Sequence, residues 1–435
     1  MLIEFSVSNF RSFREKQTLS MVAVPRLTKR ENVFNPYSKS EKLPSLLKAA
    51  VIYGPNASGK SNLLRALGVV SQICLLEPTN RDVPLPISPF RFDAELSMAA
   101  SVFELHFVQA GLRYMFTLAA NQQRVVQEKL VVFPGGKESV LYDRQHSTIG
   151  ETYSFGARLK EHSSSDFLDV WQKITPPRLL FIAQAVANSS DESSPLHAPF
   201  KWLKQSTFSL LNGMGAMSRA SQRLAQENIV HATDIAEFLR GVDVPVSTIR
   251  VEDVASAPLT LSMAHSLINP SIPTPNPTPT PTPNTLPLKA HTTILTHNSA
   301  IGDADINFED ESDGTKNLIG FWLPWATKEP TDKDESRRLL IVDELDSSLH
   351  PKIVAALIEK HITSEQSSQL IFSTHDTHLM DAKLLRRDQI WITERDVNGA
   401  TQLRSIHDFE GRESEDIEKR YYEGRYRGLP FVKRG

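Results

Sequence analysis

The sequence predicts an α/β protein in which a parallel sheet carries a phosphate-binding loop and an antiparallel β lobe lies beside it. The stretch GPNASGKSN, Gly54–Asn62, follows the apolar run Ala49–Tyr53, an order typical of strand, glycine loop and helix. The apolar run Leu339–Val342 leads directly into two carboxylates, as at the end of a buried parallel strand. Alternating apolar and polar runs between residues 103 and 133 predict antiparallel strands.

Length and composition limit the class of protein. At 435 residues the chain is long enough for two or three domains, and its net charge of -3 predicts no overall attraction to nucleic acid or membranes. The single cysteine, Cys74, lies among apolar residues, which favours a buried thiol and fits a reducing compartment. The sequence has no secretory signal and no apolar run near the roughly 18 residues of a membrane span, so we expect a cytoplasmic protein.

Residues 1–135 are predicted to form a β-rich lobe around the strand–loop–helix unit. Ile3–Val7 alternates as an edge strand would, and Phe103–Phe107, Tyr114–Leu118 and Val125–Phe133 have the same pattern. This part of the chain is the N-terminal half of the predicted α/β head.

Residues 136–267 are predicted to form a mainly helical insertion. Apolar residues have helical spacing at 157–159, 167–171 and 208–211. Asp234, followed three residues later by Glu237, predicts the start of a helix.

Residues 268–287 are predicted to form a disordered linker, because alternating Pro and Thr cannot build a helix or a central strand. A spacer is favoured over a ligand for a proline-binding module. Residues 288–435 then return to an α/β pattern, with a helix at 353–362 and a strand at 369–372.

The sequence from Gly54 to Ser61 fits the P-loop pattern G-x4-G-K-S in full. Its glycines let backbone N–H groups face phosphates, and Lys60 supplies a cation to the β- and γ-phosphates. Ser61 offers a hydroxyl to Mg²⁺, and the positive end of the following helix dipole faces the anion.

Two further strands end in polar residues. Asp343, after Leu339–Val342, is placed to hold Mg²⁺ through water, and the adjacent Glu344 is placed to polarise an attacking water. His375, after Gln369–Phe372, is expected to contact the γ-phosphate rather than to be structural. The stretch ESDGTK, residues 311–316, precedes an apolar helix and forms another N-terminus suited to an anion.

Taken in order, the P-loop, ESDGTK, LLIVDELDSSLHP and FSTHD resemble the ATP-binding-cassette (ABC) ATPases of the SMC, RecF and OLD type. The stretches NFRSF (Asn9–Phe13), LLRRDQIWITERD (Leu384–Asp396) and EKRYYEGRYRGLPF (Glu418–Phe431) resemble the RloA/AbiLi-type AAA-15 ATPases of bacterial phage-defence operons. The resemblance covers residues 1–135 and 290–431. It implies an ABC-ATPase head, with the helical insertion between the P-loop (Walker A) and the signature motif.

The resemblance implies ATP and Mg²⁺ as cofactors and a role for each motif. Catalytic roles fall on Glu344 and His375, and metal binding on Ser61 and Asp343. Nucleotide binding falls on Arg11, Gly54, Pro55, Asn56, Ala57, Ser58, Gly59, Lys60, Ser61 and Asn62. The signature that acts in trans is Ser312, Asp313, Gly314 and Thr315, and the dimer-contacting loop is Asp346, Ser347, Ser348, Leu349 and His350.

The sequence departs from the ABC pattern in three places. Asp313 stands in place of the first signature glycine, and Thr315 in place of its glutamine. Neither Gln72 nor Gln109 stands where a Q-loop glutamine is expected. The insertion lacks heptads long enough for an SMC-length coiled coil.

The resemblance implies an ATP-hydrolysing ATPase that forms a head-to-head dimer or a higher homo-oligomer. It also implies that the protein acts as the sensor or regulatory subunit of an anti-phage system with a separate nuclease effector. The alternative is an SMC/RecF-like ATPase in DNA repair or chromosome maintenance, and neighbouring nuclease or recombination genes would separate the two. A third alternative, a nucleotide-locked scaffold, is disfavoured by Glu344. Direct DNA or RNA binding is left open but is not indicated by the charge, and no membrane partner is expected.

The C-terminal stretch 419–428 interleaves basic and aromatic residues. It is interpreted first as a tail packed on the head with Tyr421 and Phe431 buried. The other two interpretations are a docking surface for a protein partner and a nucleic-acid contact.

Overall fold

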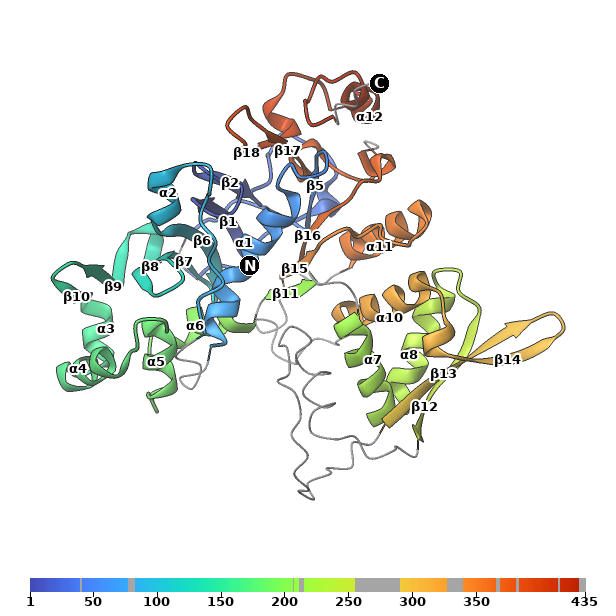
Figure 1. Cartoon of the computed structure of the whole chain (residues 1–435), viewed down its shortest axis with the longest axis horizontal. Coiled ribbons are helices and arrows are strands. Elements are labelled where there is room, and N and C mark those ends of the chain that lie inside the picture. Colours follow the sequence, from blue (N-terminus) through green and yellow to red (C-terminus); the bar gives the residue numbers. More distant parts are fainter. Residues whose placement is uncertain are drawn as a thin grey trace, which may run out of the picture. The chain divides into compact units, whose positions relative to one another are not determined.

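The computed structural model describes residues 1–39, 41–76, 83–205, 207–210, 215–254, 290–326, 339–364, 368–380, 383–413 and 415–429, in two compact units (Figure 1). Unit 1 comprises Met1–Gly213 with Lys328–Gly435, and unit 2 comprises Met214–Thr327. The structure thus divides the chain after residues 213 and 327, whereas the sequence patterns placed boundaries after residues 135, 267 and 287. The chain beyond residue 135 does not leave the β lobe, because β9 and β10 continue its sheet.

The antiparallel lobe of unit 1 is a seven-stranded sheet with the order β10-β9-β8-β7-β6-β1-β2. Its strands are β1 (Leu2–Ser8), β2 (Gln17–Ser20), β6 (Ser101–Gln109), β7 (Leu112–Ala120), β8 (Val125–Phe133), β9 (Ser139–Ser147) and β10 (Gly150–Phe155). The four strands predicted in this part of the chain are confirmed. The prediction of an edge position for the first was wrong, because β1 pairs with β2 on one side and β6 on the other.

The second sheet of unit 1 has six strands in the order β11-β15-β16-β5-β17-β18. They are β5 (Ala49–Tyr53), β11 (Thr207–Leu210), β15 (Leu339–Val342), β16 (Gln369–Ser373), β17 (Ile390–Arg395) and β18 (Thr401–Ser405). All neighbours are parallel except β17 and β18. Every residue of β5, β15 and β16 is buried, as expected for central parallel strands. The predicted α/β class, with a parallel core and an antiparallel lobe, is therefore confirmed.

Helices and a small hairpin complete unit 1. The helices are α1 (Lys60–Cys74), α2 (Ala94–Met98), α3 (Ala157–His162), α4 (Ser165–Ile174), α5 (Phe181–Ala187), α6 (His197–Gln205), α11 (Pro351–Thr363) and α12 (Ile417–Tyr422). Strands β3 (Val33–Phe34) and β4 (Leu46–Leu47) pair with each other. One apolar core joins the lobe, α1 and the parallel sheet, with Phe5, Leu64 and Ile52 among its buried members. Cys74 is buried in the same core, as predicted.

Unit 2 combines helices α7 (Gly215–Glu227), α8 (Ile229–Arg240) and α10 (Asp313–Ala326) with a three-stranded antiparallel sheet. The strands are β12 (Val246–Val254), β13 (Ala290–Ser299) and β14 (Gly302–Asn307). Helix α10 packs against α7 and α8. The predicted Pro/Thr-rich linker, residues 268–287, lies outside the described residues.

Two local predictions were wrong. Residues 208–211 were expected to be helical, but 207–210 form β11 and pair in parallel with β15. Asp234 was expected to start a helix, but it lies inside α8, whose N-cap is Asn228. The Asn228 side chain accepts a hydrogen bond from Val230 N at 2.9 Å, which satisfies a free amide of the first turn.

Among the helices in the described parts of the chain, none combines the length and the apolar character that crossing a membrane requires.

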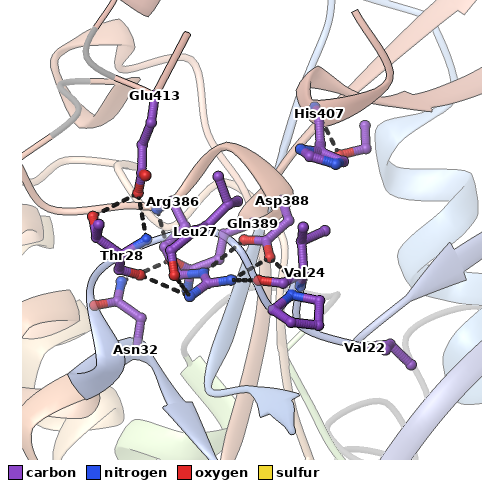
Figure 2. Close-up of polar contacts among 12 residues, drawn as sticks. Val22, Val24, Leu27, Thr28, Asn32, Arg386, Asp388, Gln389, His407 and Glu413 are labelled. Atoms are coloured by element: carbon purple, nitrogen blue, oxygen red, sulfur yellow. Dashed lines mark hydrogen bonds and ion pairs between the residues drawn. The ribbon is translucent and has the colours of Figure 1, made fainter. Parts of the chain in front are cut away.

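A buried polar network joins the first and last parts of unit 1 (Figure 2). Arg386, fully buried, donates two hydrogen bonds to Asp388, at 2.9 Å and 2.7 Å. Its guanidinium also donates to the carbonyls of Val24, Leu27 and Thr28. All the guanidinium nitrogens therefore have partners, and most of these lie more than 350 residues away in the sequence.

Gln389 links the same network to the P-loop strand. Its carbonyl oxygen accepts from Asn32 at 2.7 Å, and its amide nitrogen donates to Ala49 O at 3.0 Å. In Figure 1 the blue N-terminal strands and the red C-terminal strands accordingly lie side by side, and β2 contacts β18. The stretch 384–396, which contributed to the family resemblance, thus joins the C-terminal part of unit 1 to its N-terminal part through Arg386 and Gln389.

His361 lies on the buried side of α11, and we expect it to make the free energy of unfolding sensitive to acid. Burial lowers its pKa to about 4, and its ring Nε2 lies 3.1 Å from Lys48 O as a hydrogen-bond donor. Between pH 6.5 and 4 the unfolded chain binds a proton that the folded chain excludes. The free energy of unfolding should therefore fall with decreasing pH in this window, by up to about 3 kcal/mol.

The His361→Gln variant should keep a donor for Lys48 and lose this contribution. Chemical unfolding at pH 7, 6, 5 and 4 should give a shallower decline for the variant than for the unaltered protein. Parallel declines in the two proteins would contradict the assignment.

Candidate functional site

The P-loop connects β5 to α1 and has an unusual backbone. Gly54 has φ 148°, Ala57 φ 62° and Gly59 φ 111°. A Cβ on Gly54 would lie 2.4 Å from Thr393 O, and one on Gly59 would lie 2.1 Å from Thr401 Oγ1. Both glycines are therefore required for β17 and β18 to pack against the loop.

Lys60 folds back over the loop that precedes it. Its ammonium donates to Gly54 O at 2.8 Å and to Pro55 O at 3.3 Å. Burial lowers the pKa of Lys60, while the charges of Asp343, Glu344 and Asp346 act in the opposite direction. The three carboxylates that follow β15 therefore interact electrostatically with Lys60, which follows β5. They do so although β16 lies between the two strands.

The two acids after β15 are held by β16. Asp343 Oδ1 accepts from Ser373 Oγ at 2.6 Å, and Ser373 Oγ accepts from the backbone N of Glu344 at 2.8 Å. Glu344 has φ 53°, in the left-handed region, and its side chain is exposed. The sharp turn therefore separates the two carboxylates, with Asp343 tied to the sheet and Glu344 free to face solvent.

The side-chain donors available for Mg²⁺ are two oxygen ligands, the type that this hard cation prefers. Ser61 and Asp343 supply a hydroxyl and a carboxylate oxygen, which suits an ion that keeps several waters and binds phosphates. No group of three or more His, Cys, Asp or Glu side chains that could hold a metal by themselves occurs in the described part of the chain. This donor set fits a magnesium ion that arrives with a nucleotide.

His375 and the loop Asp346–His350 lie against each other. The backbone N of His375 donates to Asp346 Oδ2 at 3.2 Å, and the His375 ring is exposed. The other oxygen, Asp346 Oδ1, is buried without a hydrogen-bond partner among the described residues. His350 closes the loop as the N-cap of α11, where its ring nitrogen accepts from Lys352 N at 3.2 Å.

A cavity of about 410 Å³ opens beside the P-loop. Arg11 lines it, and burial, followed by the charges of Arg65 and Arg91, lowers the pKa of Arg11. Asn62 donates to Ser12 Oγ at 2.9 Å, so the loop after β1 is joined to α1. A site with this much positive charge favours an anionic ligand.

Sequence reasoning missed several residues of this cavity: Ser12, Arg65, Phe92, Arg395 and Gly399. Ser12 lies inside the NFRSF motif and could have been included. Nothing local distinguishes Phe92 or Arg395, because the fold alone brings them to the loop. The glutamines considered for a Q-loop, Gln72 and Gln109, do not line this cavity.

The predicted signature lies in unit 2, so the site assembled here consists of unit 1 residues alone. Ser312 Oγ accepts from Thr315 N at 3.1 Å and thereby satisfies a free amide at the start of α10. Asp313 and Gly314 begin that helix. The role of these residues in trans stays a prediction.

The C-terminal stretch packs on unit 1. Tyr421 and Tyr426 are buried, and Tyr421 OH donates to Gly428 O at 2.8 Å. Arg425 and Arg427 are exposed and pair with Glu423 and Glu394. The first interpretation of this stretch, a packed tail, is confirmed for Tyr421, and Phe431 lies outside the described residues.

Comparisons with known proteins identify one matching family. Residues 49–381 match the family described as "AAA domain, putative AbiEii toxin, Type IV TA system". A search of curated proteins found no match. Among solved structures, a crystal structure of an SMC head bound to the C-terminal winged-helix domain of ScpA is 13% identical, with TM-score 0.42, covering 93% of this chain and 97% of that one.

The SMC head domain from Thermotoga maritima is 14% identical, with TM-score 0.37, covering 93% of this chain and 98% of that one. The family match spans most of the chain and contains the P-loop, Asp343, Glu344 and His375. The chain therefore belongs to this family of AAA domains.

Proposed function

We propose that the protein binds ATP with Mg²⁺ at the P-loop and hydrolyses it. The observation that carries this proposal is the convergence of Lys60, Asp343 and Glu344 at one edge of the parallel sheet. Lys60 and the N-terminus of α1 bind the phosphates, and Arg11 adds a second cation in the same cavity. Ser61 and Asp343 would hold Mg²⁺, which neutralises charge on the phosphates.

Glu344 is the proposed general base. Hydrolysis needs a residue that orients and deprotonates an attacking water near the γ-phosphate. Asp343 is tied to Ser373, whereas the Glu344 carboxylate is exposed, and its charge acts against the lowering of the Lys60 pKa. His375, at the end of the adjacent strand β16, is the proposed γ-phosphate contact.

The proposed active form is a head-to-head dimer. Ser312–Thr315 of one protomer would cover the nucleotide of the other, and the loop Asp346–His350 would contact the partner. Asp346 Oδ1 in this loop is buried and has no hydrogen-bond partner among the described residues. Buried polar atoms normally have a partner, so this atom supports a contact that a second protomer would complete.

The proposed biological role is that of a sensor or regulatory ATPase of the AAA-15, RloA/AbiLi type in a bacterial anti-phage system with a nuclease effector. The family description, which names a putative AbiEii toxin of a type IV TA system, supports a defence role. The alternative is an SMC/RecF-like ATPase in DNA repair or chromosome maintenance, and neighbouring nuclease or recombination genes separate the two. The test of the role is to purify the protein with its operon neighbours and to measure mass and ATPase rate together.

Replacing Lys60 with alanine tests the proposed site. Losing a charged donor to the phosphates should weaken Mg·ATP binding by about 10- to 100-fold. Isothermal titration calorimetry of both proteins measures this loss.

The control is Lys137→Ala, which removes an exposed lysine just after β8, outside the residues that line the P-loop cavity. It should bind Mg·ATP like the unaltered protein. Equal affinity of the Lys60 variant and this control would refute the proposed phosphate site.

A further inference from the structure

The P-loop cavity adjoins a second cavity of about 470 Å³, and an aromatic side chain lies where the two meet. Phe92, Arg395 and Gly399 line both cavities. The P-loop residues line only the first. The second alone is lined by the apolar Phe90 and Val397 and by the polar Arg14, Asp93, Asp396 and Asn398. A ligand with its phosphates on the P-loop would therefore reach an aromatic wall at the junction.

Phe92 is the aromatic side chain at this junction. It is 70% exposed, so its ring remains available to a ligand. The guanidinium carbon of Arg395 lies 5.3 Å from the ring centroid, and the ring of Phe90 lies 5.6 Å away. These two contacts fix the ring from the protein side without covering it.

The turn between β17 and β18 holds this arrangement. Gly399 has φ +76°, and a Cβ there would lie 2.9 Å from Arg395 Nη2 and 3.4 Å from Phe92 Cδ2. Arg395 Nε donates to Gly399 O at 3.2 Å, and Asp396 accepts from the backbone N of Asn398 and Ala400. The turn thus requires glycine and keeps Arg395 against Phe92.

We propose that Phe92, supported by Arg395, is the platform on which the nucleobase of the bound nucleotide stacks. A nucleoside triphosphate carries its charge at one end and a flat heteroaromatic base at the other. The cavity has the same polarity, with Lys60 and Arg11 near the loop and Phe92 at the junction. Stacking on an aromatic ring is available to every base, because every base has a π-face.

This inference rests on the proposed ATP site, and two ligands separate the two ideas. Inorganic tripolyphosphate reports the phosphate site alone, whereas ATP reports the phosphate and base sites together. Calorimetry with Mg²⁺ should show that Phe92→Ala weakens ATP binding by roughly 10- to 100-fold. It should leave tripolyphosphate binding unchanged, and Phe92→Trp should restore ATP affinity.

The control is Met98→Ala, because Met98 is 85% exposed, lies in the nearby helix α2 and lines neither cavity. It should bind both ligands normally. Unchanged ATP affinity in Phe92→Ala, or an equal loss for both ligands, would overturn the platform while Lys60-dependent binding survives. Absence of Lys60-dependent binding of either ligand would overturn the ATP site and the platform together.

Discussion

Replacing Glu344 with glutamine is expected to leave Mg·ATP affinity unchanged and to slow hydrolysis by about 10²- to 10⁴-fold. Glutamine has the size of glutamate but cannot accept the proton of the attacking water. Asp343, Ser373 and Lys60 keep their contacts, because only the backbone N of Glu344 takes part in the network that holds the two acids. Single-turnover hydrolysis and equilibrium binding, measured on the same preparation, separate the two effects.

The matched control is Glu359→Gln, an exposed glutamate on α11 outside the site. It should hydrolyse ATP at the normal rate. The glutamine variant at position 344 should also accumulate as an ATP-bound dimer, which size-exclusion chromatography with and without ATP detects. Normal multiple-turnover hydrolysis by this variant would remove Glu344 from the mechanism.

The core of the site was predictable because its signals are local. The P-loop spacing, the apolar run before Asp343 and the strand before His375 are each contained in about ten residues. Parallel strands end at one edge of a sheet, so three such strands necessarily bring their terminal residues near one another. The structure places β16 between β5 and β15, an order that the sequence patterns did not specify.

The parts that were not predictable depend on tertiary contacts. The spacing at 208–211 suits a helix, but pairing with β15 determines that 207–210 are extended. The Asp234–Glu237 pattern imitates a helix start, although the buried face of α8 already includes Ala232. Phe92 and Arg395 lie more than 300 residues apart in the sequence, and only the tertiary fold brings them into contact.

The largest expected loss of stability follows the replacement of Arg386 with methionine. Methionine fills much of the same space but leaves the Asp388 carboxylate, 5% exposed, without its cation. Removing one partner of a buried ion pair typically costs about 3–5 kcal/mol. The carbonyls of Val24, Leu27 and Thr28 also lose their donor, so the segment 24–28 should detach from the turn at 386–389 before the lobe unfolds. Urea unfolding followed by circular dichroism measures the loss.

Two further variants distinguish an unpaired charge from lost packing. Arg425→Met removes an exposed arginine from its pair with Glu423, and should change stability by less than about 1 kcal/mol. In the double variant Arg386→Met with Asp388→Asn, the asparagine oxygen can still accept from Val24 N, a bond of 2.8 Å in the present structure. Because the buried charge is gone, the double variant should recover part of the stability that Arg386→Met alone loses. If it is no more stable than the single variant, the cost arises from the lost carbonyl contacts, and the ion pair itself contributes little to holding the two ends of unit 1 together.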